Sequence, residues 1–92
     1  MDANEAKAKV IKDLDGQTVN KFGCSIEARL VDPPSLENLK DTNGNLWPMW
    51  VIYREPDGYV AAFDPDNVDY NLCINGTIAS TYTCLRTLFD SL

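Results

Sequence analysis

The fold is decided by one segment, WPMWVIYREPDGYVAAFD, residues 47–64. Its two arms, 49–54 and 59–63, are rich in the β-branched and aromatic residues that suit a pleated, half-buried surface. Between the arms, Pro56 presets the first central position of a type I turn, and Gly58 accepts a positive φ without steric cost. The segment therefore predicts a β-hairpin whose three-residue loop ends in a glycine bulge.

The loop length fixes how the two arms pair. We expect the pairs Glu55–Tyr59, Tyr53–Ala61 and Val51–Phe63. Both faces of this hairpin carry large apolar groups. We therefore expect the hairpin to be central in the fold and covered, at least in part, on both sides.

Length and composition set the class of protein. The 92 residues predict one domain, 1–92, with one modest core. No run of about 18 apolar residues and no secretory leader is visible, so we expect no membrane span and a cytoplasmic location. The three cysteines (Cys24, Cys73 and Cys84) lack CxxC spacing, which favours free thiols over a zinc site or a disulfide framework.

The net charge of −6 is unevenly distributed. Residues 55–92 contain six acidic residues and a single basic one, Arg86, and no basic residue occurs from 55 to 85. Such a surface repels nucleic acid, and it attracts basic partners. We therefore expect no direct nucleic-acid binding.

The segments before the hairpin predict one helix and one strand. Asp2 and Glu5 form a capping-box pattern that begins a helix over 2–15, and Gly16 ends it. Residues 24–30 alternate between apolar and polar side chains, which predicts a half-buried strand. The connection 33–45 contains a short helical turn capped by Ser35 and a tight reversal at Asn43-Gly44.

The segment after the hairpin fits two structures. As a helix, 77–92 places five apolar side chains on one stripe. As a strand, it would follow a second hairpin turn at Asn75-Gly76. We favour the helix, which gives an α+β fold: a small antiparallel sheet of three or four strands with an N-terminal and a C-terminal helix, in the order α-β-β-β-α.

The sequence offers little for catalysis. The chain contains no histidine, which excludes Ser-His and Cys-His nucleophile pairs and histidine-ligated metals. Asp64-Pro65-Asp66 follows an apolar run, and this order resembles the first motif of haloacid-dehalogenase-type phosphatases. That family also uses a later lysine, and no lysine follows Asp64. We expect a non-enzymatic protein without a cofactor.

The acidic segment 64–71 has two further interpretations. Its carboxylates and amides are the oxygen ligands that calcium prefers, so a weak calcium site is one alternative. The EF-hand pattern is not met, because Val68, Asp69 and Asn75 stand where that loop needs an oxygen ligand, a glycine and a glutamate. A solvated turn held by aspartate side chains is the other alternative.

Aromatic residues beside these acids favour a protein-binding surface, since Trp and Tyr dominate binding energy at interfaces. We predict a non-enzymatic module of the inhibitor or immunity-protein type, including phage-encoded mimics of nucleic-acid charge. It would occlude a basic surface of a toxin or of a nucleic-acid-handling protein. The predicted contact residues are Asp64, Asp66, Asp69, Tyr70, Glu55, Asp57, Tyr59 and Trp47. An alternative is a structural or homo-oligomeric subunit, a homodimer rather than a monomer, paired through strand 24–30.

Overall fold

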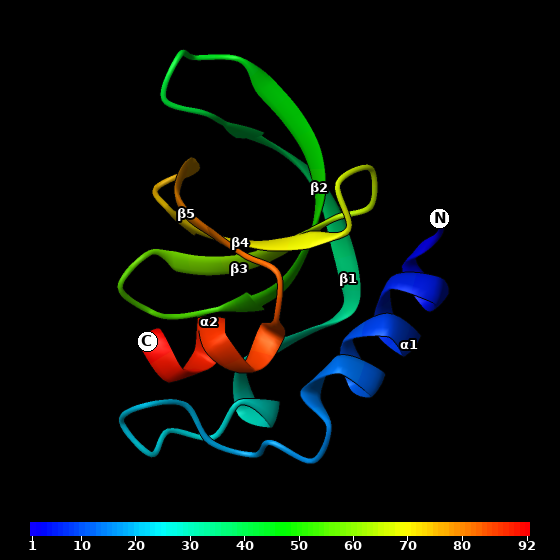
Figure 1. Cartoon of the computed structure of the whole chain (residues 1–92), viewed down its shortest axis with the longest axis vertical. Coiled ribbons are helices and arrows are strands. Elements are labelled where there is room, and N and C mark those ends of the chain that lie inside the picture. Colours follow the sequence, from blue (N-terminus) through cyan, green and yellow to red (C-terminus); the bar gives the residue numbers. More distant parts are fainter.

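The structure, a computed structural model, describes all residues from 1 to 92. Five strands form a barrel in the order β1-β2-β3-β4-β5, and two helices pack on it (Figure 1). The elements are α1 (Ala3–Leu14), a 3₁₀ turn η1 (Glu27–Arg29), β1 (Leu30–Lys40), β2 (Leu46–Arg54), β3 (Tyr59–Asp64), β4 (Asp69–Ile74), β5 (Thr77–Tyr82) and α2 (Leu85–Ser91). The α+β class and both terminal helices are confirmed, but the expected three or four strands are wrong, because there are five.

The barrel is closed by a single bridge. Consecutive strands pair antiparallel, whereas β1 and β5 meet in parallel at one pair only, Lys40 with Thr77. The Lys40 N–H donates to the Gly76 carbonyl oxygen at 2.9 Å. Beyond this point the edge of β5 has no strand partner on that side.

The central hairpin forms as the sequence predicts at its turn. The Glu55 N–H donates to the Tyr59 carbonyl oxygen at 2.7 Å, and Gly58 has a φ of 97°. Tyr53 pairs with Ala61 as expected.

The expected Val51–Phe63 pair is wrong, because a bulge at Ile52 shifts the register. Val51 then faces Ala62. The bulge lets two consecutive residues, Ile52 and Tyr53, join the same apolar cluster.

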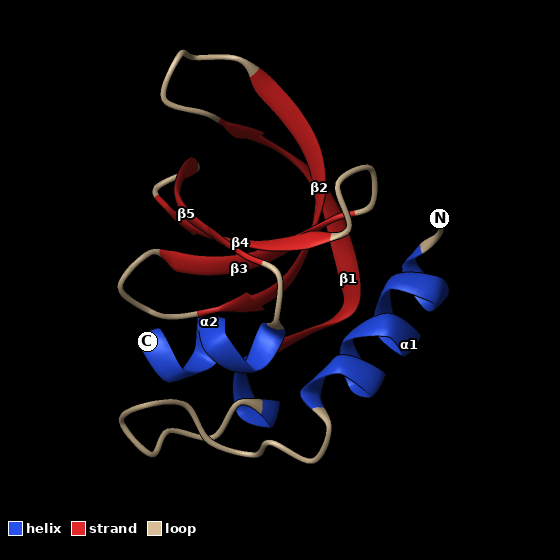
Figure 2. Cartoon of the chain, viewed as in Figure 1, coloured by secondary structure: helices blue, strands red, loops and turns tan.

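Two apolar clusters cover the two faces of the barrel sheet. The inner one consists of side chains that fit a narrow barrel: Leu39, Met49, Val51, Ala62 and Cys73. The outer one joins the strands to the helices. Figure 2 shows α1 beside β1 and α2 below β3. Its helical members are Val10 of α1 and Leu85, Leu88 and Phe89 of α2. Neither helix is long and apolar enough to cross a membrane.

Local side-chain bonds explain why α1 is predicted well and the strand 24–30 is not. In α1 the capping box is confirmed: the Glu5 N–H donates to Asp2 Oδ1 at 2.8 Å, and the Asp2 N–H donates to Glu5 Oε1 at 3.2 Å. In 24–30, the Ala28 N–H donates to Ser25 Oγ at 3.3 Å, which favours a turn over a ladder. The segment contains η1 instead of a strand, so it offers no strand edge for a homodimer.

β1 and β5 occupy segments for which the sequence predicts other structure. β1 covers residues 33–40 of the segment 33–45, which we expected to be a connection with a helical turn. Residues 31–34 lose register with β2, and this irregularity accommodates two prolines. The predicted helix over 77–92 is wrong in its first half, where β5 pairs with β4, and correct in its second half, where α2 lies. The reversal at Asn43-Gly44 is confirmed, with Gly44 at a φ of 82°.

Candidate functional site

The predicted contact residues lie at the two ends of the β2–β3 hairpin. Glu55, Asp57 and Tyr59 surround its loop. Asp64, Asp66 and Asp69 surround its exit into β4. The acidic segment is continuous in sequence but divided in space, so each end is described separately.

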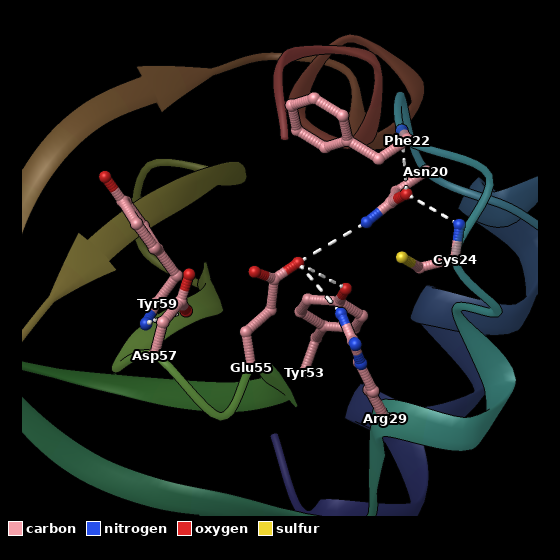
Figure 3. A network of polar contacts seen from close by, with 8 residues as sticks. All are labelled: Asn20, Phe22, Cys24, Arg29, Tyr53, Glu55, Asp57 and Tyr59. Atoms are coloured by element: carbon pink, nitrogen blue, oxygen red, sulfur yellow. Dashed lines mark hydrogen bonds and ion pairs between the residues drawn. The ribbon is translucent and has the colours of Figure 1, made fainter.

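At the loop end, Glu55 is part of an internal polar network (Figure 3). Its Oε1 accepts hydrogen bonds from the Tyr53 hydroxyl at 2.8 Å and from Asn20 Nδ2 at 3.4 Å, and lies 3.4 Å from Arg29 Nη1. Its side chain is only 13% exposed. Glu55 therefore anchors the loop that follows α1, and Asp57 and Tyr59 lie apart from this network (Figure 3).

Asn20 extends the same network into the chain between α1 and η1. Its Oδ1 accepts hydrogen bonds from the N–H groups of Phe22 and Cys24, both at 3.0 Å. The next residue, Lys21, donates its N–H to the Phe89 carbonyl oxygen at 3.0 Å, which ties this loop to α2. The role of this network is to hold the loop against the barrel.

At the exit end, Asp64 is buried and organises its own loop. Its Oδ1 accepts from the N–H groups of Asp66 at 2.9 Å and Asn67 at 3.4 Å, and its Oδ2 accepts from Asn67 Nδ2 at 2.8 Å. Only 5% of the residue is exposed. These bonds hold the turn that leads to Val68, which has a φ of 53°. Asp66 points from this turn as an exposed acid.

Tyr70 is also inside the molecule. It is 2% exposed, and its hydroxyl donates to Asp13 Oδ2 of α1 at 2.6 Å. Burial, and then the bond to Asp13, raise the pKa of Tyr70 well above its usual range. Burial tends to raise the pKa of Asp13, but bonds from Tyr70 and Lys9 outweigh it, and the net pKa is lowered. Tyr70 thus fastens α1 to the barrel and does not reach a partner.

The last two predicted residues, Trp47 and Asp69, lie with Asp64 around one depression, which we call the barrel mouth. Its volume is about 210 Å³. Its lining contains residues of β2, β4 and β5, of the turn between β1 and β2, and of the turn between β3 and β4. The lining residues are Asp41, Trp47, Met49, Asp64, Asn67, Asp69, Asn71, Ile78 and Thr81. Three predicted residues, Trp47, Asp64 and Asp69, therefore share one surface, and no basic residue lines it.

The barrel mouth holds negative charge next to an exposed aromatic ring. Trp47 is 42% exposed, and its Nε1–H donates to Asp41 Oδ2 at 2.9 Å. That bond is the main cause of the lowered pKa of Asp41. Asp41 is absent from the predicted set, although its place just before the Asn43-Gly44 reversal marks it as a turn residue.

Asp69 is a carboxylate whose charged form the fold disfavours. Burial raises its pKa, and the charge of Asp64 raises it further, while the bond from Asn71 Nδ2 at 3.1 Å lowers it. Asn71 is itself held by Thr81, whose Oγ1 donates to Asn71 Oδ1 at 2.6 Å. A cation placed in the barrel mouth would favour the charged form of Asp69.

A larger cavity of about 540 Å³ lies between α1 and the chain around η1 and the start of β1. It is lined by apolar side chains including Val10, Leu14 and Ile26, and none of the predicted contact residues contributes to it. Lys7 and Asp32 on its rim pair with each other at 2.9 Å. This cavity can accept an apolar group, but it lacks the concentration of carboxylates seen at the barrel mouth.

The calcium alternative lacks a ligand cluster. The structure brings no group of three or more Asp, Glu, Cys or His side chains into a metal-binding arrangement. Both carboxylate oxygens of Asp64 already accept hydrogen bonds within the loop.

Comparison of the chain with protein-family models, with curated proteins and with solved structures finds no significant match.

Proposed function

We propose that this protein is a non-enzymatic binding module that captures a basic side chain of a partner protein at the barrel mouth. The observation that carries the proposal is the exposed ring of Trp47 in the same depression as the carboxylate of Asp69. Asp41 adds negative charge there, although both its oxygens accept hydrogen bonds from Asn43, Asn45 and Trp47. The volume of about 210 Å³ is below the range of about 300–1,000 Å³ typical of small-molecule sites. It suits one long side chain better than a separate ligand.

The chemistry of the barrel mouth favours arginine or lysine. A guanidinium stacks on a tryptophan face and donates to carboxylates with a geometry that matches theirs. The fold disfavours the charged form of Asp69, since burial and the charge of Asp64 raise its pKa. A partner's cation beside Asp69 would favour its charged form.

The charge of the whole chain supports the same class of partner. A net charge of −6, with no basic residue from 55 to 85, accelerates encounter with a basic protein surface. An inhibitor or immunity protein that occludes a toxin or a nucleic-acid-handling protein is the function that this profile supports best.

The test is a titration with a capped seven-residue peptide: a central arginine flanked on each side by alternating threonine and valine. The control peptide carries citrulline, which keeps the shape of arginine and removes its charge. We expect the arginine peptide to bind and to shift the NMR signal of the Trp47 indole N–H, and the citrulline peptide to bind at least about tenfold more weakly. The affinity should fall as salt rises from about 20 mM to about 300 mM. Equal binding of the two peptides, or no binding of either, would defeat the proposal.

A further inference from the structure

The edge of β5 is open over most of its length. On one side β5 pairs with β4 from end to end, and on the other it has the single bridge between Thr77 and Lys40. Residues 78–82 therefore direct about half of their backbone N–H and C=O groups away from any strand of the chain.

This edge carries few of the features by which proteins block strand addition. From Ile74 to Cys84 the sequence contains no charged residue and no proline, both of which commonly protect an exposed edge. Ala79 forms a bulge, which twists the strand but leaves the residues after it paired with β4. An extended backbone can therefore pair with residues 78–82 without contacting a charged side chain or a proline of β5.

The open edge is continuous with the barrel mouth. Two β5 residues, Ile78 and Thr81, line the barrel mouth. They share the inner face of the barrel because the bulge at Ala79 separates them: Ile78 faces Cys73 and Thr81 faces Asn71. A strand added beside β5 would therefore direct one of its side chains toward the carboxylates of the mouth.

We infer that the partner presents its basic side chain from an extended segment, which adds to the free edge of β5 while an arginine or lysine enters the barrel mouth. This inference rests on the proposed function and specifies its partner. Charge complementarity selects a basic segment as the occupant. A second copy of this chain would offer an uncharged β5 and a net charge of −6, so it would leave the carboxylates unpaired.

Strand addition is tested with two N-methylated versions of the arginine peptide. One carries N-methyl groups on the first alternate set of its amides, and the other carries the same number on the second set. Composition and charge are equal, but only one set can donate to β5. We expect one version to bind at least about tenfold more weakly than the other, because two or three backbone hydrogen bonds are lost. Equal affinities for the two versions would overturn the inference.

Amide hydrogen exchange, followed by NMR with the unmethylated peptide bound, separates this inference from the function on which it rests. Strand addition predicts slower exchange at amides within 78–82 together with the shift at Trp47. A shift at Trp47 without protection of β5 would leave the proposed function intact and overturn strand addition. Protection of β5 in the peptide-free protein that grows with protein concentration would show that a second copy occupies the edge, and would also overturn it.

Discussion

Replacing Tyr70 with phenylalanine tests whether this residue fastens α1 to the barrel. The change removes only the hydroxyl that donates to Asp13 Oδ2 at 2.6 Å. The ring keeps its contact with Phe63, whose centroid lies 5.1 Å away at an interplanar angle of 49°. Loss of stability in Tyr70→Phe therefore reports on one hydrogen bond.

The size of the effect follows from the surroundings of that bond. A hydrogen bond to a charged group contributes about 1.5–3 kcal/mol. The Asp13 side chain is 22% exposed and keeps its ion pair with Lys9 at 2.9 Å, so water can partly replace the lost donor. We expect a loss of about 1.5 kcal/mol in the free energy of unfolding, near the lower limit, and a fall in Tm of about 6–12 °C for a domain of this size.

The pH dependence gives a second readout of the same bond. The pKa of Asp13 is lowered in the folded protein, so its contribution to stability is present above the unfolded pKa and is lost as pH falls through the folded pKa. Tyr70→Phe removes one cause of that lowering. Urea unfolding should therefore show a difference between wild type and variant that is full near neutral pH and shrinks below about pH 4.

Two results would refute this account of Tyr70. Equal stability of the two proteins at neutral pH would mean that the bond contributes nothing. Weaker binding of the arginine peptide by a folded Tyr70→Phe would mean that Tyr70 belongs to the binding surface after all.

Three further predictions concern single residues. Asp69→Asn should leave stability at neutral pH unchanged or slightly raised in urea unfolding, because a carboxyl whose pKa is raised by folding costs stability once it ionises, and solvent screens most of this effect; a clear loss would contradict this. Gly58→Ala and Gly16→Ala should each cost about 1 kcal/mol or more, since φ is 97° and 80° and the exposed Asn75 side chain near Gly58 can turn away from a new Cβ; an unchanged stability in either variant would contradict the left-handed backbone. Iodoacetamide followed by mass spectrometry should modify exposed Cys84 long before buried Cys73, because N–H groups at the start of α2 lower the pKa of the first thiol and burial raises that of the second to about 11; faster loss of Cys73 would disprove the burial.

The parts of the fold that the sequence predicts are those with local causes. The capping box of α1 and the turn at Gly58 each depend on residues within a few positions of one another. β1 and β5 depend on pairing with distant segments. Pro33-Pro34 signals a loop locally, yet residues 35–40 pair with β2, and the apolar stripe of 77–92 fits a helix until β4 provides a partner for its first half.

The candidate site shows the same division. Trp47 and Asp69 are predicted from aromatic and acidic composition, and the structure places both at the barrel mouth. Asp64 and Tyr70 belong to the same sequence pattern, but their burial depends on a folded turn and on Asp13 of α1. Burial of that kind is set by tertiary contacts, so a pattern of acids and aromatics identifies the region and not the exposed residues within it.

The most direct test of binding at the barrel mouth is a comparison of two variants with the same charge change. Asp69→Asn removes a carboxylate of the barrel mouth, and Asp57→Asn removes an exposed one at the opposite end of the hairpin. Calorimetric titration with the arginine peptide should show affinity about tenfold lower for Asp69→Asn and within about twofold of wild type for Asp57→Asn. Equal affinities of the two variants would show that only net charge matters and would contradict a binding site at the barrel mouth.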